Sequence, residues 1–135
     1  MVDPRGSGLV NGMGRRWRQE QEVGAAGSTG RGEANLFGLC SFLIVECLRN
    51  GMSPKDAGLA ACRRVVANTV EKRLLNSRGK PKFDLNFYVL NAKGEFAGVS
   101  LYEKVGSAPV KYAACDENGP RLVPIEPLFE GASND

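Results

Sequence analysis

The sequence contains no histidine among its 135 residues. This removes the commonest general base and the commonest metal ligand, and it excludes every Ser-His or Cys-His catalytic arrangement. Any hydrolytic chemistry would need a different base, such as an N-terminal amine, a lysine or a carboxylate.

Cysteine is sparse, and no two cysteines form a CxxC pair. Cys40 and Cys47 are separated by two helical turns, about 10 Å along a helix axis, which is too far for a disulfide. A zinc site is not expected, because the cysteines lack the spacing of zinc ligands and the sequence has no histidine. We interpret all four residues, Cys40, Cys47, Cys62 and Cys115, as buried reduced thiols, which favours a reducing compartment.

Long apolar runs are also absent, and none approaches the roughly 20 residues of a membrane span. The first residues lack the apolar core of a secretory signal, and the net charge of +3 is too small to argue for nucleic acid. We therefore expect neither a membrane nor a nucleic-acid partner, and the compartment stays open. The basic cluster Arg15-Arg16-Trp17-Arg18 is interpreted as a solvated segment, with a nucleic-acid contact as the alternative.

The apolar pattern divides the chain into three parts. We expect residues 1–22 to be a divergent, disordered segment and 126–135 to be a flexible tail. Between them, 23–125 shows the periodicity of one domain with a buried core.

Within this domain the pattern predicts a strand, two helices and then antiparallel strands. The strand covers 23–28, and the helices cover 35–50 and about 53–73, with Ser53 as the cap of the second. From residue 83 the period changes to two, which predicts a hairpin of 83–90 with 96–102 and a further strand at 110–115. This order predicts an α+β fold.

The stretch VGAAGSTGRGE at 23–33 places four glycines and two hydroxyls just before the first predicted helix. A phosphate cradle is one interpretation, because bare amides at a helix start attract anions. However, the GxxxxGK[ST] and GxGxxG patterns of nucleotide sites are both missing. A tight structural turn is the second interpretation.

The third interpretation is an oxyanion site. Thr29 supplies a hydroxyl donor beside the amide of Gly30, and two such donors aimed at one point stabilise a tetrahedral oxyanion. Gly32 permits a second close approach of a ligand. This combination fits amide hydrolysis better than phosphate transfer.

The same stretch, followed by an apolar helix, RNGMSP, a second helix and NFYVLNAKGEFAGVSLY, resembles the C-terminal part of the glycosylasparaginase family. These N-terminal-nucleophile (Ntn) hydrolases are related to the isoaspartyl peptidase/L-asparaginases. The resemblance covers roughly residues 21–115.

The resemblance implies a partial αββα sandwich and an enzyme that exposes a threonine whose own α-amine is the base. The implied substrate is N4-(β-N-acetylglucosaminyl)-asparagine, cut at its side-chain amide, with no cofactor and no metal. The family's T-G-x-G substrate loop matches Thr29, Gly30, Arg31 and Gly32. Its threonine hydroxyl and glycine amide are the oxyanion donors.

The sequence departs from the family in its nucleophile. Thr29 and Thr69 are the only threonines, one in the substrate loop and one in a predicted helix, and the family's R-V-G-D-S-P segment has no match at 5–14. We therefore expect a C-terminal, β-subunit-like portion that is inactive alone and pairs with a missing α-chain or forms a homo-oligomer. The alternatives are a fragment of the isoaspartyl peptidase/L-asparaginase type and a non-catalytic interaction module.

Overall fold

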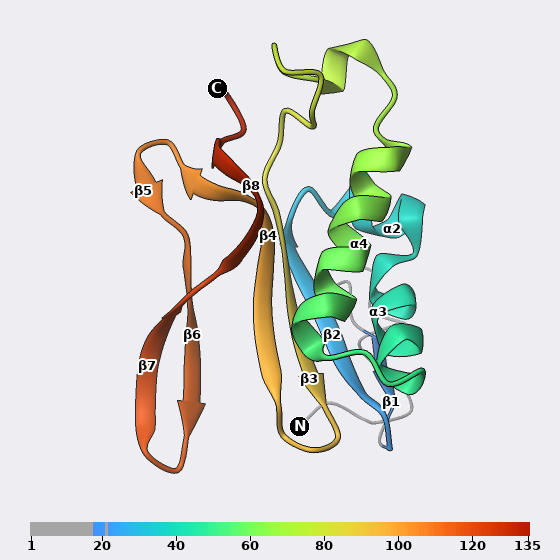
Figure 1. Ribbon diagram of the computed structural model, residues 1–135, viewed down its shortest axis with the longest axis vertical. Helices are drawn as coiled ribbons and strands as arrows, with labels where there is room; N and C mark the ends of the chain where they lie inside the picture. Colours follow the sequence, from blue (N-terminus) through green and yellow to red (C-terminus); the bar gives the residue numbers. More distant parts are fainter. Residues whose placement is uncertain (1–17, 21) are drawn as a thin grey trace.

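The computed structural model describes residues 18–20 and 22–135, and its α+β architecture confirms the predicted fold class (Figure 1). The elements in chain order are β1 (Arg18–Glu20), β2 (Gly24–Gly30), α2 (Gly32–Gly38), α3 (Cys40–Arg49), α4 (Pro54–Asn68), a 3-10 turn (Lys72–Leu74), β3 (Leu85–Asn91), β4 (Phe96–Val105), β5 (Ala108–Pro109), β6 (Lys111–Asp116), β7 (Gly119–Pro124) and β8 (Glu126–Ala132).

Among the described residues, the main sheet has six strands in the order β1-β2-β3-β4-β5, with β8 also on β4. Neighbours along this path are antiparallel, whereas β8 runs parallel to β4. The β3–β4 hairpin and the strand before the glycine stretch therefore match the sequence prediction. The strand itself runs two residues further than expected and includes Thr29 and Gly30.

Helices α3 and α4 cover one face of this sheet, as Figure 1 shows. The buried core lies between the two layers, because alternate strand residues such as Phe87 and Val99 meet Ile44 and Val65 from the helices. Burying each large apolar side chain of this kind is worth about 1.5–3 kcal/mol. Gly58 of α4 is pressed against β4, since a Cβ there would lie 2.6 Å from Val99 Cγ2.

The predicted helix at 35–50 is broken at Leu39, whose φ of 48° is left-handed. The break ends α2 at Gly38, where Arg64 of α4 donates to the Gly38 carbonyl over 3.2 Å. Leu39 remains largely exposed. The second predicted helix begins as expected, with Asp56 N–H donating to Ser53 Oγ, but it ends at Asn68 instead of about residue 73.

We expected a flexible tail at 126–135, but Glu126–Ala132 forms strand β8. This strand pairs with β4, and residues of the turn at 76–80 also contact it. Arg78 donates to the Ala132 carbonyl over 3.0 Å, and the Lys80 ammonium lies 4.0 Å from the ring centre of Phe129. Partners this far apart in sequence leave no local signal.

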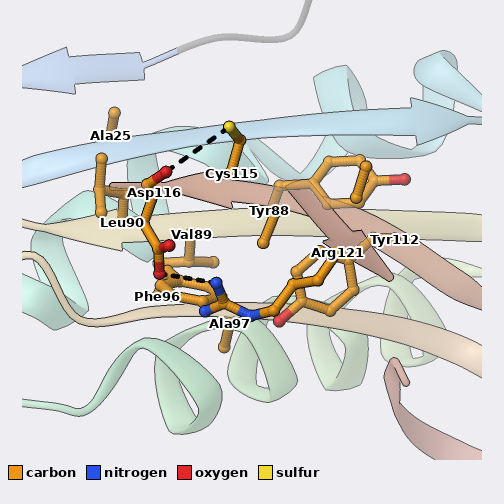
Figure 2. A pocket seen from close by; sticks show the side chains of 12 residues that line it. Ala25, Tyr88, Val89, Leu90, Phe96, Ala97, Tyr112, Cys115, Asp116 and Arg121 are labelled. Atoms are coloured by element: carbon orange, nitrogen blue, oxygen red, sulfur yellow. Dashed lines mark hydrogen bonds and ion pairs between the residues drawn. The ribbon is translucent and has the colours of Figure 1, made fainter. Parts of the chain in front are cut away.

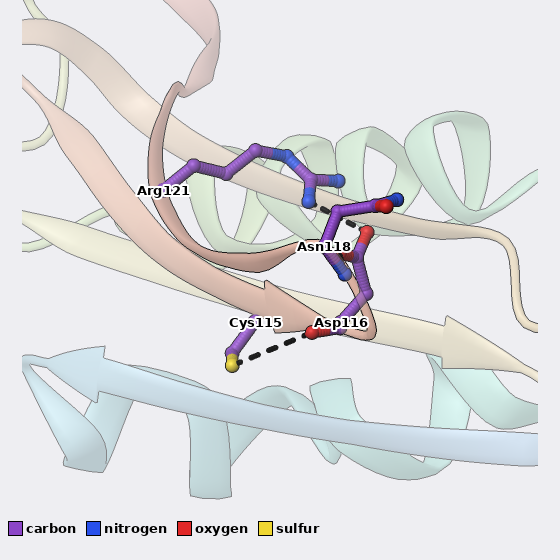
Figure 3. A network of polar contacts seen from close by, with 4 residues as sticks. All are labelled: Cys115, Asp116, Asn118 and Arg121. Atoms are coloured by element: carbon purple, nitrogen blue, oxygen red, sulfur yellow. Dashed lines mark hydrogen bonds and ion pairs between the residues drawn. The ribbon is translucent and has the colours of Figure 1, made fainter.

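The antiparallel pair β6–β7 lies on the side of the sheet opposite the helices (Figure 1). Tyr112 of β6 packs on Gly98 of β4, where an added Cβ would lie 2.6 Å from the tyrosine ring. At the turn of the hairpin, Arg121 donates to Asp116 Oδ2 over 2.6 Å, and Asn118 N–H donates to Asp116 Oδ1 (Figure 3). These two hydrogen bonds fix the position of the Asp116 carboxylate. The one from Arg121 also lowers the pKa of Asp116.

The four cysteines are all free, as predicted. Cys40 and Cys62 are buried, Cys47 is half-buried, and Cys115 is exposed, so the expectation of burial is wrong for Cys115.

The segment predicted to be disordered covers residues 1–22, of which residues 1–17 and 21 lie outside the described residues. Most of the basic cluster lies outside them too. Arg18–Glu20 forms strand β1, which pairs with β2. In the described parts of the chain, no helix is both long and apolar enough to cross a membrane.

Candidate functional site

The sheet face opposite the helices carries the candidate site, and we call it the open face. Strand register places its side chains in three rows across β2, β3 and β4. The rows are Ala25–Leu90–Phe96, Gly27–Tyr88–Gly98 and Thr29–Asn86–Ser100. The first row is apolar and the third is entirely polar, so the open face changes character toward the end of β2.

Thr29 stands on the open face and is exposed. Its hydroxyl lies 2.9 Å from the Tyr88 hydroxyl, and either oxygen can be the donor of this hydrogen bond. Neighbouring Ser28 faces the opposite way, toward the helices, as expected from strand alternation. The Thr29 hydroxyl is therefore directed out of the helix-packed core.

Gly30 follows at the end of β2 with a φ of 104°, a conformation that side chains rarely adopt. A Cβ there would lie within contact of the Asp84 carbonyl, so glycine is required. The next amide, Arg31 N–H, donates to Asp84 O over 3.0 Å. Because bonded pairs alternate along an antiparallel ladder, the Gly30 N–H is directed away from β3, toward the opposite edge of β2.

The structure separates the other two residues of the predicted loop from this position. The Arg31 guanidinium lies over the Phe83 ring, 5.4 Å from its centre, and lines a cleft of about 370 Å³ between α2, the end of α4 and the 3-10 turn. Gly32 is buried in the first turn of α2. Thus Thr29 and Gly30 lie at the end of β2, whereas the Arg31 side chain enters a different cleft.

A buried carboxamide fixes the strand beneath Thr29. Asn35 of α2 is only 2% exposed, and its Nδ2 donates to Ser28 Oγ over 2.7 Å and to Ser41 Oγ over 3.0 Å. The Ser41 N–H in turn donates to Asn35 Oδ1 over 3.2 Å. One side chain thereby joins β2, α2 and α3 next to the candidate donors.

Two open-face residues near Thr29 were missed from the sequence. Asn86 lies directly opposite Thr29 in the register, and Tyr88 reaches it diagonally. Their only signal was their position in the alternating strand, where they occupied the side opposite the apolar set. The alternation shows on which side of the strand these side chains lie, but it does not show which residue they contact.

The hairpin β6–β7 encloses a cleft of about 330 Å³ against the apolar end of the open face (Figure 2). Its walls are aromatic: Tyr88 and Tyr112 have ring centres 6.1 Å apart, and Phe96 meets Tyr112 edge-on at 6.4 Å. Arg121 lies over the Phe96 ring at 5.7 Å and is paired with Asp116. Among the described residues, no group of three or more histidine, cysteine or carboxylate side chains is placed to hold a metal ion.

Comparison of the sequence with known proteins gives the following result. No family model matches the chain. The chain is 31% identical over 105 residues to an N(4)-(β-N-acetylglucosaminyl)-L-asparaginase from Elizabethkingia miricola, a match that covers 76% of this chain and 28% of the relative. The chain is therefore similar in sequence to a glycosylasparaginase.

This similarity agrees with the family that the stretch at 23–33 and the segments after it resemble. The chain spans less than a third of the length of the curated relative that it matches.

Proposed function

We propose that this chain is the C-terminal, substrate-binding portion of a glycosylasparaginase-type Ntn hydrolase. In this proposal the Thr29 hydroxyl and the Gly30 N–H stabilise the oxyanion that forms when the side-chain amide of a glycosylated asparagine is cleaved. The observation that carries the proposal is the exposed Thr29 hydroxyl on the open face, beside a Gly30 amide that is directed away from the β2–β3 ladder. The similarity to the E. miricola asparaginase supports the choice of reaction.

The chain alone is expected to have no amidase activity, because neither threonine can be an N-terminal nucleophile. Thr29 lies within β2, so its α-nitrogen belongs to a peptide bond. Thr69 follows directly after α4, its backbone N–H donates to the Val66 carbonyl, and its hydroxyl donates to the Val65 carbonyl over 2.6 Å. The nucleophile and its amine would come from a partner segment that faces the open face.

Binding of substrate to the chain tests this proposal. Titration of the isotopically labelled chain with N4-(β-N-acetylglucosaminyl)-L-asparagine is expected to shift the backbone amide signals of Thr29 and Gly30. Thr29→Val removes the hydroxyl while keeping the shape of the side chain, and it should weaken binding. Thr69→Val is the matched control and should bind as the unmodified chain does.

A titration with a β-aspartyl dipeptide distinguishes the isoaspartyl peptidase type, which would prefer that ligand. Shifts confined to residues far from the end of β2, or equal losses in both threonine variants, would contradict the proposed site. Release of aspartate by the purified chain would contradict the proposed inactivity.

Pairing with another chain is a second proposal, and exposed apolar side chains favour it. On the open face Leu90 and Phe96 are direct neighbours in the β3–β4 register, and they are 48% and 42% exposed. Apolar surface of this kind commonly marks an interface. Light scattering of the purified chain is expected to show self-association, and a stable monodisperse monomer would count against an interaction module.

A further inference from the structure

Tyr88 is placed to decide what the Thr29 hydroxyl can do. Its phenol oxygen lies 2.9 Å from Thr29 Oγ1, on the same face of the sheet. An aliphatic hydroxyl has one proton to donate and two lone pairs that accept. If Thr29 donates to Tyr88, its proton is used within the protein; if Tyr88 donates to Thr29, the proton of Thr29 is free for a ligand.

The position of the Tyr88 ring is set by its surroundings. Both of its direct neighbours across the sheet, Gly27 and Gly98, are glycines, so the ring has room to lean along the sheet toward Thr29. Tyr112 occupies the space over Gly98 and packs against Tyr88, with ring planes inclined at 53° (Figure 2). The β6–β7 hairpin therefore supports the tyrosine from the side away from Thr29.

A phenol is a more acidic O–H group than an aliphatic alcohol, so it is the better donor of the two. We infer that Tyr88 donates to Thr29 Oγ1 and thereby leaves the Thr29 proton directed outward, toward the ligand. This inference rests on the proposed function, because it assigns to Thr29 the role of oxyanion donor. Tyr88 is then a positioning residue: it acts through Thr29 and does not itself touch the reacting atoms.

Two consequences follow from a chain of two hydroxyls. The Tyr88 bond restricts rotation of the Thr29 side chain, so the donor is oriented before a ligand arrives. Hydrogen bonds in a chain also polarise one another, which strengthens the outer bond. A hydrogen bond of this kind contributes about 0.5–1.5 kcal/mol, so its loss is expected to weaken ligand binding by about two- to twelvefold.

The matched variants are Tyr88→Phe and Tyr112→Phe, because each removes one hydroxyl from the same aromatic cluster and keeps its ring. The first measurement needs no ligand: three-bond couplings of the Thr29 side chain report whether its rotamer is fixed. We expect a single rotamer in the unmodified chain and in Tyr112→Phe, and an averaged one in Tyr88→Phe. An unchanged rotamer in Tyr88→Phe overturns the inference.

The second measurement is the affinity for N4-(β-N-acetylglucosaminyl)-L-asparagine. Weaker binding in Tyr88→Phe with unchanged binding in Tyr112→Phe supports the inference, whereas equal losses in both variants assign the effect to ring packing and overturn it. Absence of binding by the unmodified chain contradicts the proposed function and, with it, the outward donor role assigned to Tyr88. The coupling measurement then still shows separately whether the bond between the two hydroxyls orients Thr29.

Discussion

Asn35 donates from its Nδ2 to Ser28 Oγ over 2.7 Å, and this bond joins helix α2 to the strand that ends at Thr29 and Gly30. The carboxamide is almost fully buried and also binds Ser41 at the start of α3. A buried polar group of this kind stabilises only while its partners are present. The position of the candidate donors thus depends on a residue that does not lie on the open face.

Replacing Asn35 by alanine should destabilise the fold. The Ser28 hydroxyl and the Ser41 N–H would lose a buried partner, which is expected to lower the free energy of unfolding by about 1–3 kcal/mol. Urea unfolding followed by circular dichroism measures this change. Asn68→Ala, at an exposed site in α4, is the control and should change stability by less than about 0.5 kcal/mol; a similarly small effect for Asn35→Ala would contradict the prediction.

Gly98→Ala should loosen the β6–β7 hairpin from the sheet. The new methyl group would lie 2.6 Å from the Tyr112 ring, and such overpacking costs about 1–3 kcal/mol. Urea unfolding of Gly98→Ala in the native and Tyr112→Ala backgrounds tests the cause. The cost should be smaller once the ring is removed, and an equal cost in both backgrounds would show that Tyr112 is not the obstacle.

The cysteines should differ in reactivity toward a thiol reagent at neutral pH. Cys115 is exposed, whereas Cys40 and Cys62 are fully buried, and burial raises their pKa values to about 11 and about 12. Because the thiolate is the nucleophile, Cys115 is expected to react first. Cys115→Ser should remove the fast phase of modification, and loss of that phase in Cys62→Ser instead would show the assignment to be wrong.

The same two thiols predict a loss of stability in alkaline solution. Their pKa values in the folded chain lie above the ordinary value of 9.0, so above that pH the folded protein keeps protons that the unfolded chain releases. The effect of these two thiols on stability should be absent below about pH 9, and it should lower stability as the pH rises toward 12. Urea midpoints across this range measure the effect, and Cys62→Ala should flatten the decline.

Asp116 should titrate below its ordinary range. The hydrogen bond from Arg121 is the main cause of the lowered pKa, followed by the one from the Asn118 amide. The ionised Asp116 therefore stabilises the hairpin above the ordinary pKa of 3.8, and this stabilisation is lost as the pH falls through the lowered pKa. Arg121→Gln should move the Asp116 titration, followed by carboxyl carbon shifts, to higher pH. Lys55→Gln, which removes the separate Lys55–Glu126 pair, should leave it unchanged.

Local patterns in the sequence predicted most of the elements correctly. The period of two placed β3 and β4, and the Ser53-Pro54 start of α4 was recognised because a cap is a local interaction. The break at Leu39 was missed because Arg64, 25 positions further along the chain, meets the carbonyl of the preceding residue. The β8 strand was missed because its pairing and its contacts with the 76–80 turn join distant segments.

For the candidate site, the sequence by itself determined the composition: a hydroxyl beside a glycine, no histidine, and no second threonine fit to be a nucleophile. Only the tertiary structure decided which way those groups face. Strand alternation and register place Thr29 on the open face beside Tyr88. Arg31 lies in the turn into α2, and its side chain lines a different cleft. The physical reason is that residue type fixes which bonds a side chain can make, whereas the packing of distant strands fixes which partner it meets.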